Sequence, residues 1–406
     1  MLKGNAIVGQ SGGPTTVINS SMVGVVDAAL KSKCIDRIFG MRFGIECMFD
    51  DFLLDLGKES PATLKLLRST PSSALGSSRY KLKKGTDEDL ERILPQLKKY
   101  NIRYFFLIGG NDTMDTIHRV TEYAATIGYD MIGVGVCKTV DNDLFGTDHT
   151  PGYPSAARYV ALSVQQGGRL ARDMQRVDPY TIFQTVGRSA GWLPAASVAG
   201  KRKPEDPPHI ILMPEAPFKK EDFLLAAQAA KEKYGWVSIC CGEGITYSDG
   251  SPVAQANVRD SHGNLEFGNK GGKCAGLVLH ELLRDELKWR GEAQIVESLQ
   301  MCASDRCVKL DLDEAYNCGR EAVRLASQGT SGVMVTITRL SKPGQPYKSG
   351  FGTIPLKEVA VEAKPMDKKY ITSDGMFVTK AFVDYVTPLV GPMPEYASLT
   401  IKKAKP

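Results

Sequence analysis

YFFLIGGNDT, residues 104–113, is the stretch that decides the fold: an apolar run, a glycine pair and three polar residues. The apolar run predicts a short buried strand. Asn111 and Asp112, directly after the glycines, are typical of a helix start, and helical periodicity continues over residues 112–127. A strand, a tight turn and a helix form the unit from which parallel α/β sheets are built.

The same alternation recurs along the chain. We predict strands near residues 5–8, 104–108, 131–136, 180–185, 209–213, 236–240 and 333–338. Helices are predicted near residues 16–31, 87–99, 112–127, 155–176, 219–234, 272–288 and 311–327. We therefore expect an α/β protein of two Rossmann-like, three-layer domains with largely parallel sheets. Residues 1–150, completed by part of 290–390, form one domain, and residues 151–290 form the other.

Composition excludes several classes of protein. A chain of 406 residues with 42% hydrophobic and 24% charged residues is typical of folded globular proteins. Its net charge of +5 is small for this length, so small anions are favoured as partners over nucleic acid. The nine cysteines lack a CxxC pair, which disfavours zinc and fits reduced thiols in the cytoplasm. Because no run of about 18 uncharged apolar residues occurs, no membrane span is expected.

Two glycine-rich loops are suited to phosphate. Gly12 and Gly13 follow the strand predicted at 5–8, and Gly110 follows the strand at 104–108. Glycines let backbone amides approach an anion, and the start of the following helix favours negative charge. The first loop matches neither the Walker P-loop nor the GxGxxG pattern. A plain strand-to-helix turn is an equal alternative there, and capping alone would explain Asn111 or Asp112.

A third loop, KTVDND at residues 138–143, follows the strand at 131–136. Asp141 and Asp143 beside Lys138 can divide into a proton acceptor and a metal-binding or orienting group. Turn formation is the alternative, since Asp and Asn favour turns. Lys138 argues for function, because a solvated lysine has no structural need at a strand end. His149, further along the loop beside Asp148, is interpreted as a hydrogen-bond partner.

A fourth loop, VGRSAGW at residues 186–192, follows the strand at 180–185. Its Arg188 lies near glycines and can bind a phosphate through two hydrogen bonds. Glu243, after the strand at 236–240, can hold substrate hydroxyls. Because ligands bind at the carboxyl ends of parallel strands, the loops are expected to meet at one site. Their amides, cations and carboxylates are the groups that phosphoryl transfer requires.

The motifs GGNDT, KTVDND and VGRSAGW resemble the phosphofructokinase family, and in particular its pyrophosphate-dependent branch. The resemblance extends over residues from about 6 to 335. It implies reversible transfer of a phosphoryl group from magnesium pyrophosphate to the 1-hydroxyl of fructose 6-phosphate, a glycolytic step. It also implies a cytoplasmic homodimer or homotetramer, with Mg²⁺ as the cofactor.

The resemblance further implies roles for individual residues. Asp141 would be the base for the acceptor hydroxyl, and Asn111 and Asp143 would be the residues associated with magnesium. Asp112 stands where ATP-using members have a glycine, so its carboxylate would repel the α-phosphate of a nucleotide. Lys138 would neutralise charge on the leaving phosphate.

The remaining implied site residues fall into a donor group and an acceptor group. The donor group, expected to bind pyrophosphate, is Gly12, Gly13, Arg79, Gly110 and Thr113. The acceptor group, expected to face the sugar, is Thr139, Val186, Gly187, Arg188 and Glu243, and Arg188 would also take part in catalysis.

One stretch departs from the family. Where the family grips the 6-phosphate with a Gln-Arg pair, this chain has Gln300 and Met301, and Asp178 to Tyr180 stand where another arginine is expected. Cations that could substitute are Arg172, Arg176, Arg306 and Lys309. Two acceptors therefore stay open: fructose 6-phosphate, or an unphosphorylated sugar or polyol. A non-catalytic relative that binds a phosphometabolite is the third alternative, against which intact Lys138, Asp141 and Asp143 argue.

Overall fold

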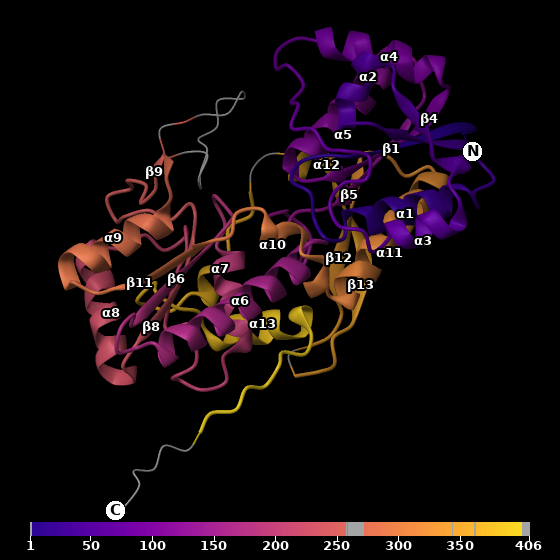
Figure 1. Cartoon of the computed structure of the whole chain (residues 1–406). Helices are drawn as coiled ribbons and strands as arrows, with labels where there is room; N and C mark the ends of the chain where they lie inside the picture. Colours follow the sequence, from indigo (N-terminus) through magenta and orange to yellow (C-terminus); the bar gives the residue numbers. More distant parts are fainter. Residues whose placement is uncertain (1, 257, 259–271, 343, 361–362, 400–406) are drawn as a thin grey trace, which may run out of the picture.

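The computed structural model describes residues 2–256, 258, 272–342, 344–360 and 363–399. Parts of the expected domains, residues 257, 259–271, 343 and 361–362, lie outside the described residues. The described chain forms two α/β lobes that lie side by side (Figure 1). Both lobes contain parallel sheets covered by helices, which confirms the predicted fold class.

The first lobe is built on a seven-stranded sheet of order β13-β12-β5-β4-β1-β2-β3. Its five central strands are parallel, and β13 and β3 pair antiparallel at the two edges. The strands are β1 (Gly4–Gln10), β2 (Ile35–Met41), β3 (Leu53–Asp55), β4 (Ile102–Gly109), β5 (Ile132–Cys137), β12 (Val333–Arg339) and β13 (Ser349–Pro355).

The second lobe is built on a four-stranded parallel sheet of order β11-β6-β8-β7. A two-stranded antiparallel ribbon, β9 with β10, lies apart from it. The strands are β6 (Tyr180–Thr185), β7 (Ile210–Leu212), β8 (Val237–Gly242), β9 (Gln255–Ala256), β10 (Gly272–Lys273) and β11 (Gly291–Ile295). The chain thus returns to the first sheet, for β12 and β13, only after it has completed the second.

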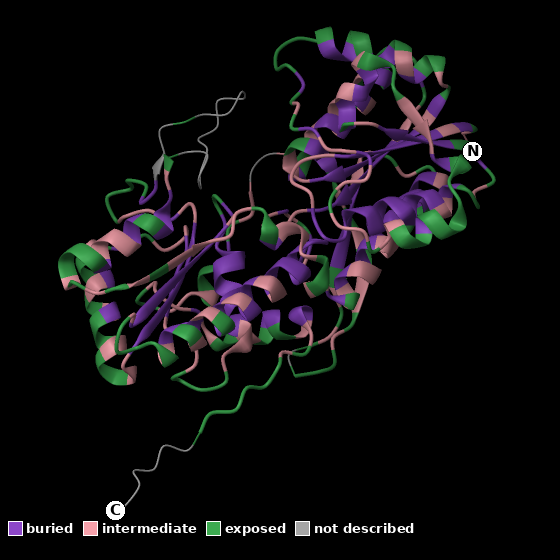
Figure 2. Ribbon diagram, viewed as in Figure 1, coloured by how far each residue is buried: buried purple, intermediate pink, exposed green. Residues whose placement is uncertain are grey.

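Helices cover both sheets, and their apolar faces point inward. In α4, for example, Leu90, Ile93, Leu94 and Leu97 recur at helical spacing and are buried. Figure 2 shows buried strands at the centre of each lobe and exposed residues on the outer helices. The helices are α1 (Ile18–Ala29), α2 (Cys47–Asp50), α3 (Pro61–Leu67), α4 (Glu88–Lys99), α5 (Asn111–Thr126), α6 (Tyr153–Asp173), α7 (Trp192–Ala196), α8 (Lys220–Tyr234), α9 (Ala275–Leu287), α10 (Leu299–Cys302), α11 (Lys309–Ser327), α12 (Leu356–Val359) and α13 (Lys380–Val390).

Two glycines bring α11 back onto the first lobe. A Cβ atom at Gly24 of α1 would lie 2.0 Å from the backbone oxygen of Tyr316, and one at Gly319 of α11 would lie 2.1 Å from that of Ser21. Any side chain at either position would therefore separate the two helices. This close packing of α1 and α11 places the start of α11 beside the loop that follows β5.

All the predicted strands occur, with bounds shifted by a few residues. The prediction missed several elements, and for three of them, β2, β11 and α13, the physical reason can be read from the sequence. Asp36 and Arg37 interrupt the apolar run of β2, and β11, GEAQI, is half polar. Pro388 lies inside α13 and conceals its helical pattern. Among the described residues, no helix is both long enough and apolar enough to cross a membrane.

Candidate active site

A cavity of 390 Å³ lies where the loops of the two lobes meet. It is formed by the loops after β1, β5, β6, β8 and β11, at the carboxyl ends of these strands. Two larger hollows lie elsewhere: one of 590 Å³ between α8, α9 and residues 247–249, and one of 510 Å³ between α1 and α11. The residues that line the cavity are Gly13, Arg79, Lys138, Thr139, Val140, Asp141, Val186, Gly187, Arg188, Glu243, Glu297, Ser298 and Met301.

Lys138 joins two of the predicted loops. Its side chain is buried, with 2% exposed, and its ammonium donates a hydrogen bond of 2.6 Å to the backbone oxygen of Gly13. Its backbone N–H donates to the oxygen of Gly109. Burial lowers the pKa of Lys138 to about 8, although the charges of Asp141 and Asp143 oppose the shift. A lysine with this pKa remains mostly cationic at neutral pH.

Asp141 carries a carboxylate oxygen, Oδ1, that is buried and accepts no hydrogen bond from the described residues. Burial and the charges of Asp143 and Glu243 raise the pKa of Asp141 to about 7, while Lys138 and Arg188 oppose the rise. A carboxylate with a pKa near the working pH is suited to accept a proton. An unpartnered buried oxygen is costly, so this atom is available to accept a hydrogen bond from a bound molecule.

Gly187 keeps space open beside this oxygen. Its φ of 111° lies in the region that favours glycine, and a Cβ atom there would lie 3.6 Å from Asp141 Oδ1. The Gly187 N–H donates to Glu243 Oε1 at 3.2 Å. Burial raises the pKa of Glu243 to about 7, against the hydrogen bond from Gly187 and the charge of Arg188. A protonated Glu243 can donate to a sugar oxygen, and an ionised one can accept from a sugar hydroxyl.

The structure brings nine of the predicted site residues to the cavity wall and leaves six outside it. The nine are Gly13, Arg79, Lys138, Thr139, Asp141, Val186, Gly187, Arg188 and Glu243. The six are Gly12, Gly110, Asn111, Asp112, Thr113 and Asp143.

Two of the residues expected to bind pyrophosphate make contacts that differ from those expected. The N–H of Gly12 donates to the oxygen of Ser78, so this amide is not directed at a ligand. Thr113 is buried, and its Oγ1 would lie 2.1 Å from a Cβ at Gly109. Its side chain therefore packs under the glycine turn and supports that turn.

Asn111 and Asp112 begin α5 and face different surroundings. The amide of Asn111 donates to the backbone oxygen of Val359 at 2.7 Å. Asp112 has 68% of its side chain exposed and forms an ion pair of 3.1 Å with Lys81.

Asp143 lies at the end of the KTVDND motif, where Lys364 contacts it from a distant part of the chain. The Lys364 N–H donates to the backbone oxygen of Asp143, and its ammonium donates to that of Thr147. Burial raises the pKa of Asp143, while the charges of Lys364 and Lys138 oppose the rise. No motif surrounds Lys364 in the sequence, so only the fold reveals this contact.

The part of the cavity wall formed after β11 holds Glu297, Ser298 and Met301. A Cβ at Gly13 would lie 2.7 Å from the methyl group of Met301, so this methionine covers the first glycine loop. Sequence reasoning noted the missing arginine here but did not identify Glu297 and Ser298 as site residues, because β11 itself was not predicted.

The cations considered as substitutes lie elsewhere. Arg306 donates to Ser163 Oγ at 2.7 Å, and Lys309 pairs with Asp313. Arg172 donates to Ser398. Among the described residues that line the cavity, none of the four candidates, Arg172, Arg176, Arg306 and Lys309, occurs. Their substitution for the missing arginine within one chain is therefore not supported.

The cavity thus brings together a buried ammonium, two guanidinium groups and buried carboxylates, an arrangement suited to phosphoryl transfer. Comparison with known proteins gives the family. Residues 5–307 match the family model described as phosphofructokinase. The chain belongs to the phosphofructokinase family.

Relatives and solved structures agree with this assignment. The chain is 36% identical over 401 residues to the pyrophosphate–fructose 6-phosphate 1-phosphotransferase of Rhodospirillum rubrum, with 96% of this chain and 95% of the relative covered. It is 31% identical over 353 residues to the sulfofructose kinase of Alkalicoccus urumqiensis, with 87% and 88% covered. A crystal structure of pyrophosphate-dependent phosphofructokinase from Nitrosospira multiformis matches with a TM-score of 0.86 and 34% identity, covering 97% of this chain and 94% of that one.

Proposed function

We propose that this protein transfers a phosphoryl group from pyrophosphate to the 1-hydroxyl of fructose 6-phosphate, reversibly. The observation that carries the proposal is the buried, unpartnered Oδ1 of Asp141 beside Gly187, in a cavity that also contains the ammonium of Lys138. The printed names of the relatives from Rhodospirillum rubrum and Methylococcus capsulatus support both substrates.

In the proposed step, Asp141 accepts the proton of the acceptor hydroxyl, and the hydroxyl oxygen forms a bond to one phosphorus of pyrophosphate. The bridging P–O bond breaks, and inorganic phosphate leaves. Lys138, cationic at neutral pH, offsets the charge that develops on the leaving phosphate. Arg79 and Arg188 line the same cavity and hold phosphoryl oxygens. Glu243, with Thr139, Val186 and Gly187, orients the sugar.

We further propose that Mg²⁺ accompanies pyrophosphate, held by oxygens of Asn111 and Asp143. The described residues contain no group of three or more His, Cys, Asp or Glu side chains that could hold a metal ion. Mg²⁺ commonly binds through one or two protein oxygens, substrate phosphates and water, so this donor set fits it. The ion would supply positive charge to the transferred phosphoryl group.

Several finer assignments rest on the family resemblance. Asp112 would exclude ATP through repulsion, and Gly12, Gly13, Gly110 and Thr113 would shape the pyrophosphate side. Residues 1–150, with part of 290–390, would bind the donor, and residues 151–290 would bind the acceptor. The protein would act in glycolysis as a cytoplasmic homodimer or homotetramer.

A second acceptor is favoured by one observation. Among the described residues, the wall after β11 contributes Glu297, Ser298 and Met301 and no cation, so a 6-phosphate placed there would lack an opposite charge from this wall. An unphosphorylated sugar or polyol needs no such charge. One relative is named sulfofructose kinase, a name that indicates an acceptor other than fructose 6-phosphate.

The test is phosphate release from magnesium pyrophosphate by the purified protein. Fructose 6-phosphate, fructose and a set of polyols are compared as acceptors, and ATP replaces pyrophosphate as the control. Turnover with fructose 6-phosphate and pyrophosphate is expected. Turnover only with an unphosphorylated acceptor would favour the second candidate, and turnover only with ATP would contradict the proposed donor.

A further inference from the structure

The loop between β5 and α6, residues 138–150, is here called the catalytic loop. It carries Lys138, Asp141 and Asp143. Asn142 lies between the two carboxylates and is wholly buried, with a φ of 57°. This left-handed backbone conformation is uncommon for residues other than glycine, although Asn tolerates it better than most. The side chain of Asn142 therefore leaves the loop at a tightly constrained position.

Both ends of the Asn142 amide are engaged. Its Oδ1 accepts a hydrogen bond of 3.0 Å from the backbone N–H of Thr150, and its Nδ2 donates one of 2.9 Å to the hydroxyl of Tyr385. Tyr385 belongs to α13 and lies 243 residues further along the chain. Asn142 thus connects the carboxylates to the far end of the catalytic loop and to a helix of the second lobe.

Tyr385 is a rigid anchor for this connection. Its hydroxyl accepts from Asn142 and donates to the backbone oxygen of Asp148 at 3.0 Å, so it ties the catalytic loop at two points. Its ring packs against Trp192, Tyr370 and Phe382, with ring centroids 5.5 to 5.9 Å apart. Removal of the hydroxyl alone would free both points and leave this packing in place.

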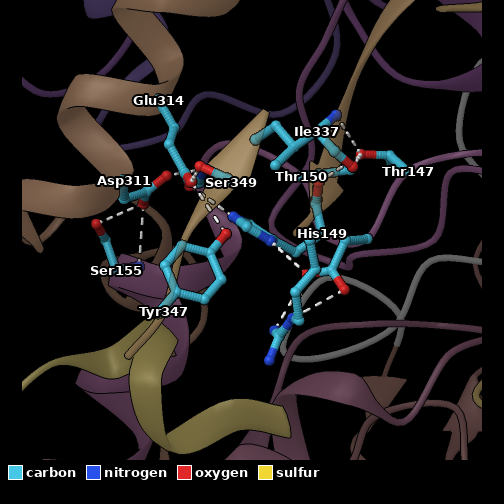
Figure 3. A network of polar contacts seen from close by, with 12 residues as sticks. Thr147, His149, Thr150, Ser155, Asp311, Glu314, Ile337, Tyr347 and Ser349 are labelled. Carbon is cyan, nitrogen blue, oxygen red and sulfur yellow. Dashed lines mark hydrogen bonds and ion pairs between the residues drawn. The ribbon is translucent and has the colours of Figure 1, made fainter. Parts of the chain in front are cut away.

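The far end of the catalytic loop is fixed by a second set of contacts (Figure 3). His149 is wholly buried, and its two ring nitrogens lie 2.9 Å from Asp148 Oδ2 and 2.7 Å from Glu314 Oε2. Glu314, on α11, also accepts from Tyr347 at 3.0 Å and from Ser349 at 2.6 Å. Asn142 therefore links this fixed end to the segment that carries Asp141, alongside the hydrogen bond from the Thr150 hydroxyl to the backbone oxygen of Thr139.

We propose that Asn142 and Tyr385 are positioning residues for phosphoryl transfer, and that their hydrogen bonds hold Asp141 and Asp143 in the reactive geometry. This inference rests on the proposed function, in which Asp141 is the base. A displacement of about 1 Å at a reacting group can reduce a rate by roughly 10²-fold. The loss of either hydrogen bond should therefore appear in kcat before it appears in substrate binding.

The test is the Tyr385→Phe variant, with Tyr153→Phe as the matched control. Tyr153, like Tyr385, is buried and packs against Trp192, and its hydroxyl donates to the backbone oxygen of Trp192. We expect Tyr385→Phe to lower kcat about tenfold or more, with KM for pyrophosphate changed less than about twofold. Tyr153→Phe should stay within about twofold of the parent in both. Similar losses in both variants, or no loss in Tyr385→Phe, would overturn the proposal.

The Asn142→Gly variant tests the other partner, because glycine accepts the same φ and removes both hydrogen bonds. We expect it to lower kcat at least as far as Tyr385→Phe does. Because Tyr385→Phe also frees the backbone oxygen of Asp148, the double variant should be slower than Asn142→Gly, but by less than the product of the two separate losses. Additive losses would mean that the two residues do not act as a unit, contrary to the proposal.

Crystal structures of Tyr385→Phe and Tyr153→Phe provide a readout that does not depend on turnover. The first should show Asn142 released from Thr150 and the Asp141 carboxylate displaced from Gly187, and the second should show neither. An unmoved catalytic loop in Tyr385→Phe would overturn the inference. Absence of turnover in the parent would instead count against the proposed function, and the two failures are thereby distinguished.

Discussion

The catalytic loop and the loop after β11 face the same cavity, yet they are built in opposite ways. Lys138 and Asn142 are buried and hydrogen-bonded to distant elements. Ser298 is exposed, and Glu297 and Met301 are only partly buried. The difference teaches that the groups proposed to transfer phosphate are held firmly by the fold, whereas the wall proposed to select the acceptor is more open to substitution.

The largest effect on turnover is expected in the catalytic loop. Lys138→Met keeps the length of the side chain and removes its charge, so the protein should fold while kcat with magnesium pyrophosphate falls by about 10²- to 10³-fold. Lys380→Met, which removes a lysine with 85% of its side chain exposed, is the control and should match the parent. A Lys138→Met protein within about fivefold of the parent would remove this lysine from the proposed mechanism.

The anchoring of the catalytic loop should appear as a pH dependence of stability. Burial alone would lower the pKa of His149, but hydrogen bonds and charges from Asp148 and Glu314 outweigh it and raise the pKa from 6.5 to about 9. Because the folded-state pKa is raised, the stabilisation is fully present below pH 6.5 and is lost as the pH rises through 9. Its size is on the order of 3 kcal/mol, from the shift of the pKa from 6.5 to about 9.

Urea unfolding between pH 6 and pH 9.5 measures this effect. The other charged and titratable groups near His149 include Asp311, whose pKa is raised by burial against the charge of His149, Arg339, paired with Asp148, and Tyr347, bonded to Glu314. In His149→Gln the unfolding free energy should lose this decline with pH, whereas Tyr129→Phe, a buried change far from the loop, should keep it. The same pH slope in parent and His149→Gln would contradict the assignment of a protonated His149.

A cation added to the wall after β11 should strengthen the binding of a phosphorylated acceptor. Met301→Arg places a guanidinium beside Glu297 and Ser298, so KM for fructose 6-phosphate should fall about tenfold, since hydrogen bonds to charged groups contribute roughly 1.5–3 kcal/mol. Met301→Leu is the control for size, and kinetics with fructose is the control for the phosphate. An unchanged KM would mean that the 6-phosphate binds away from this wall.

The smallest effect on turnover is expected at Asp112, on the side of the site proposed to bind pyrophosphate. Asp112→Gly removes the carboxylate proposed to repel nucleotides, so turnover with ATP should rise severalfold. Lys81→Ala breaks the ion pair of 3.1 Å but keeps the carboxylate, and it should give no such gain. A gain in both variants would assign the selectivity to the ion pair, and a gain in neither would contradict the role of Asp112.

The sequence predicted the place of the catalytic loop in the fold better than the contacts that support the loop. Lys138 and Asp141 follow an apolar strand directly, so their place at the edge of the sheet could be predicted. Tyr385 and Lys364 reach the same loop from the end of the chain, and α13, which carries Tyr385, contains Pro388. Contacts over such separations arise from tertiary packing, which no local pattern encodes.

The wall after β11 was harder to predict for a different reason. Glu292 and Gln294 make β11 half polar, so the sequence did not predict this strand of the second sheet. The position of the loop after β11 was therefore not predicted either. The sequence did identify Met301 as unusual, but its contact with Gly13 depends on the way the two lobes meet. The identity of the acceptor therefore depends on the region where local sequence was least informative.

The most direct test of the central claim is the turnover of Asp141→Asn with magnesium pyrophosphate and the acceptor that the parent uses. Asn has the same shape as Asp but cannot accept the proton, and general-base catalysis contributes roughly 10²- to 10⁴-fold. We predict a loss of kcat in that range, with an unfolding midpoint equal to or above that of the parent. A folded Asp141→Asn protein that retains turnover within about tenfold of the parent would contradict the assignment of Asp141 as the base.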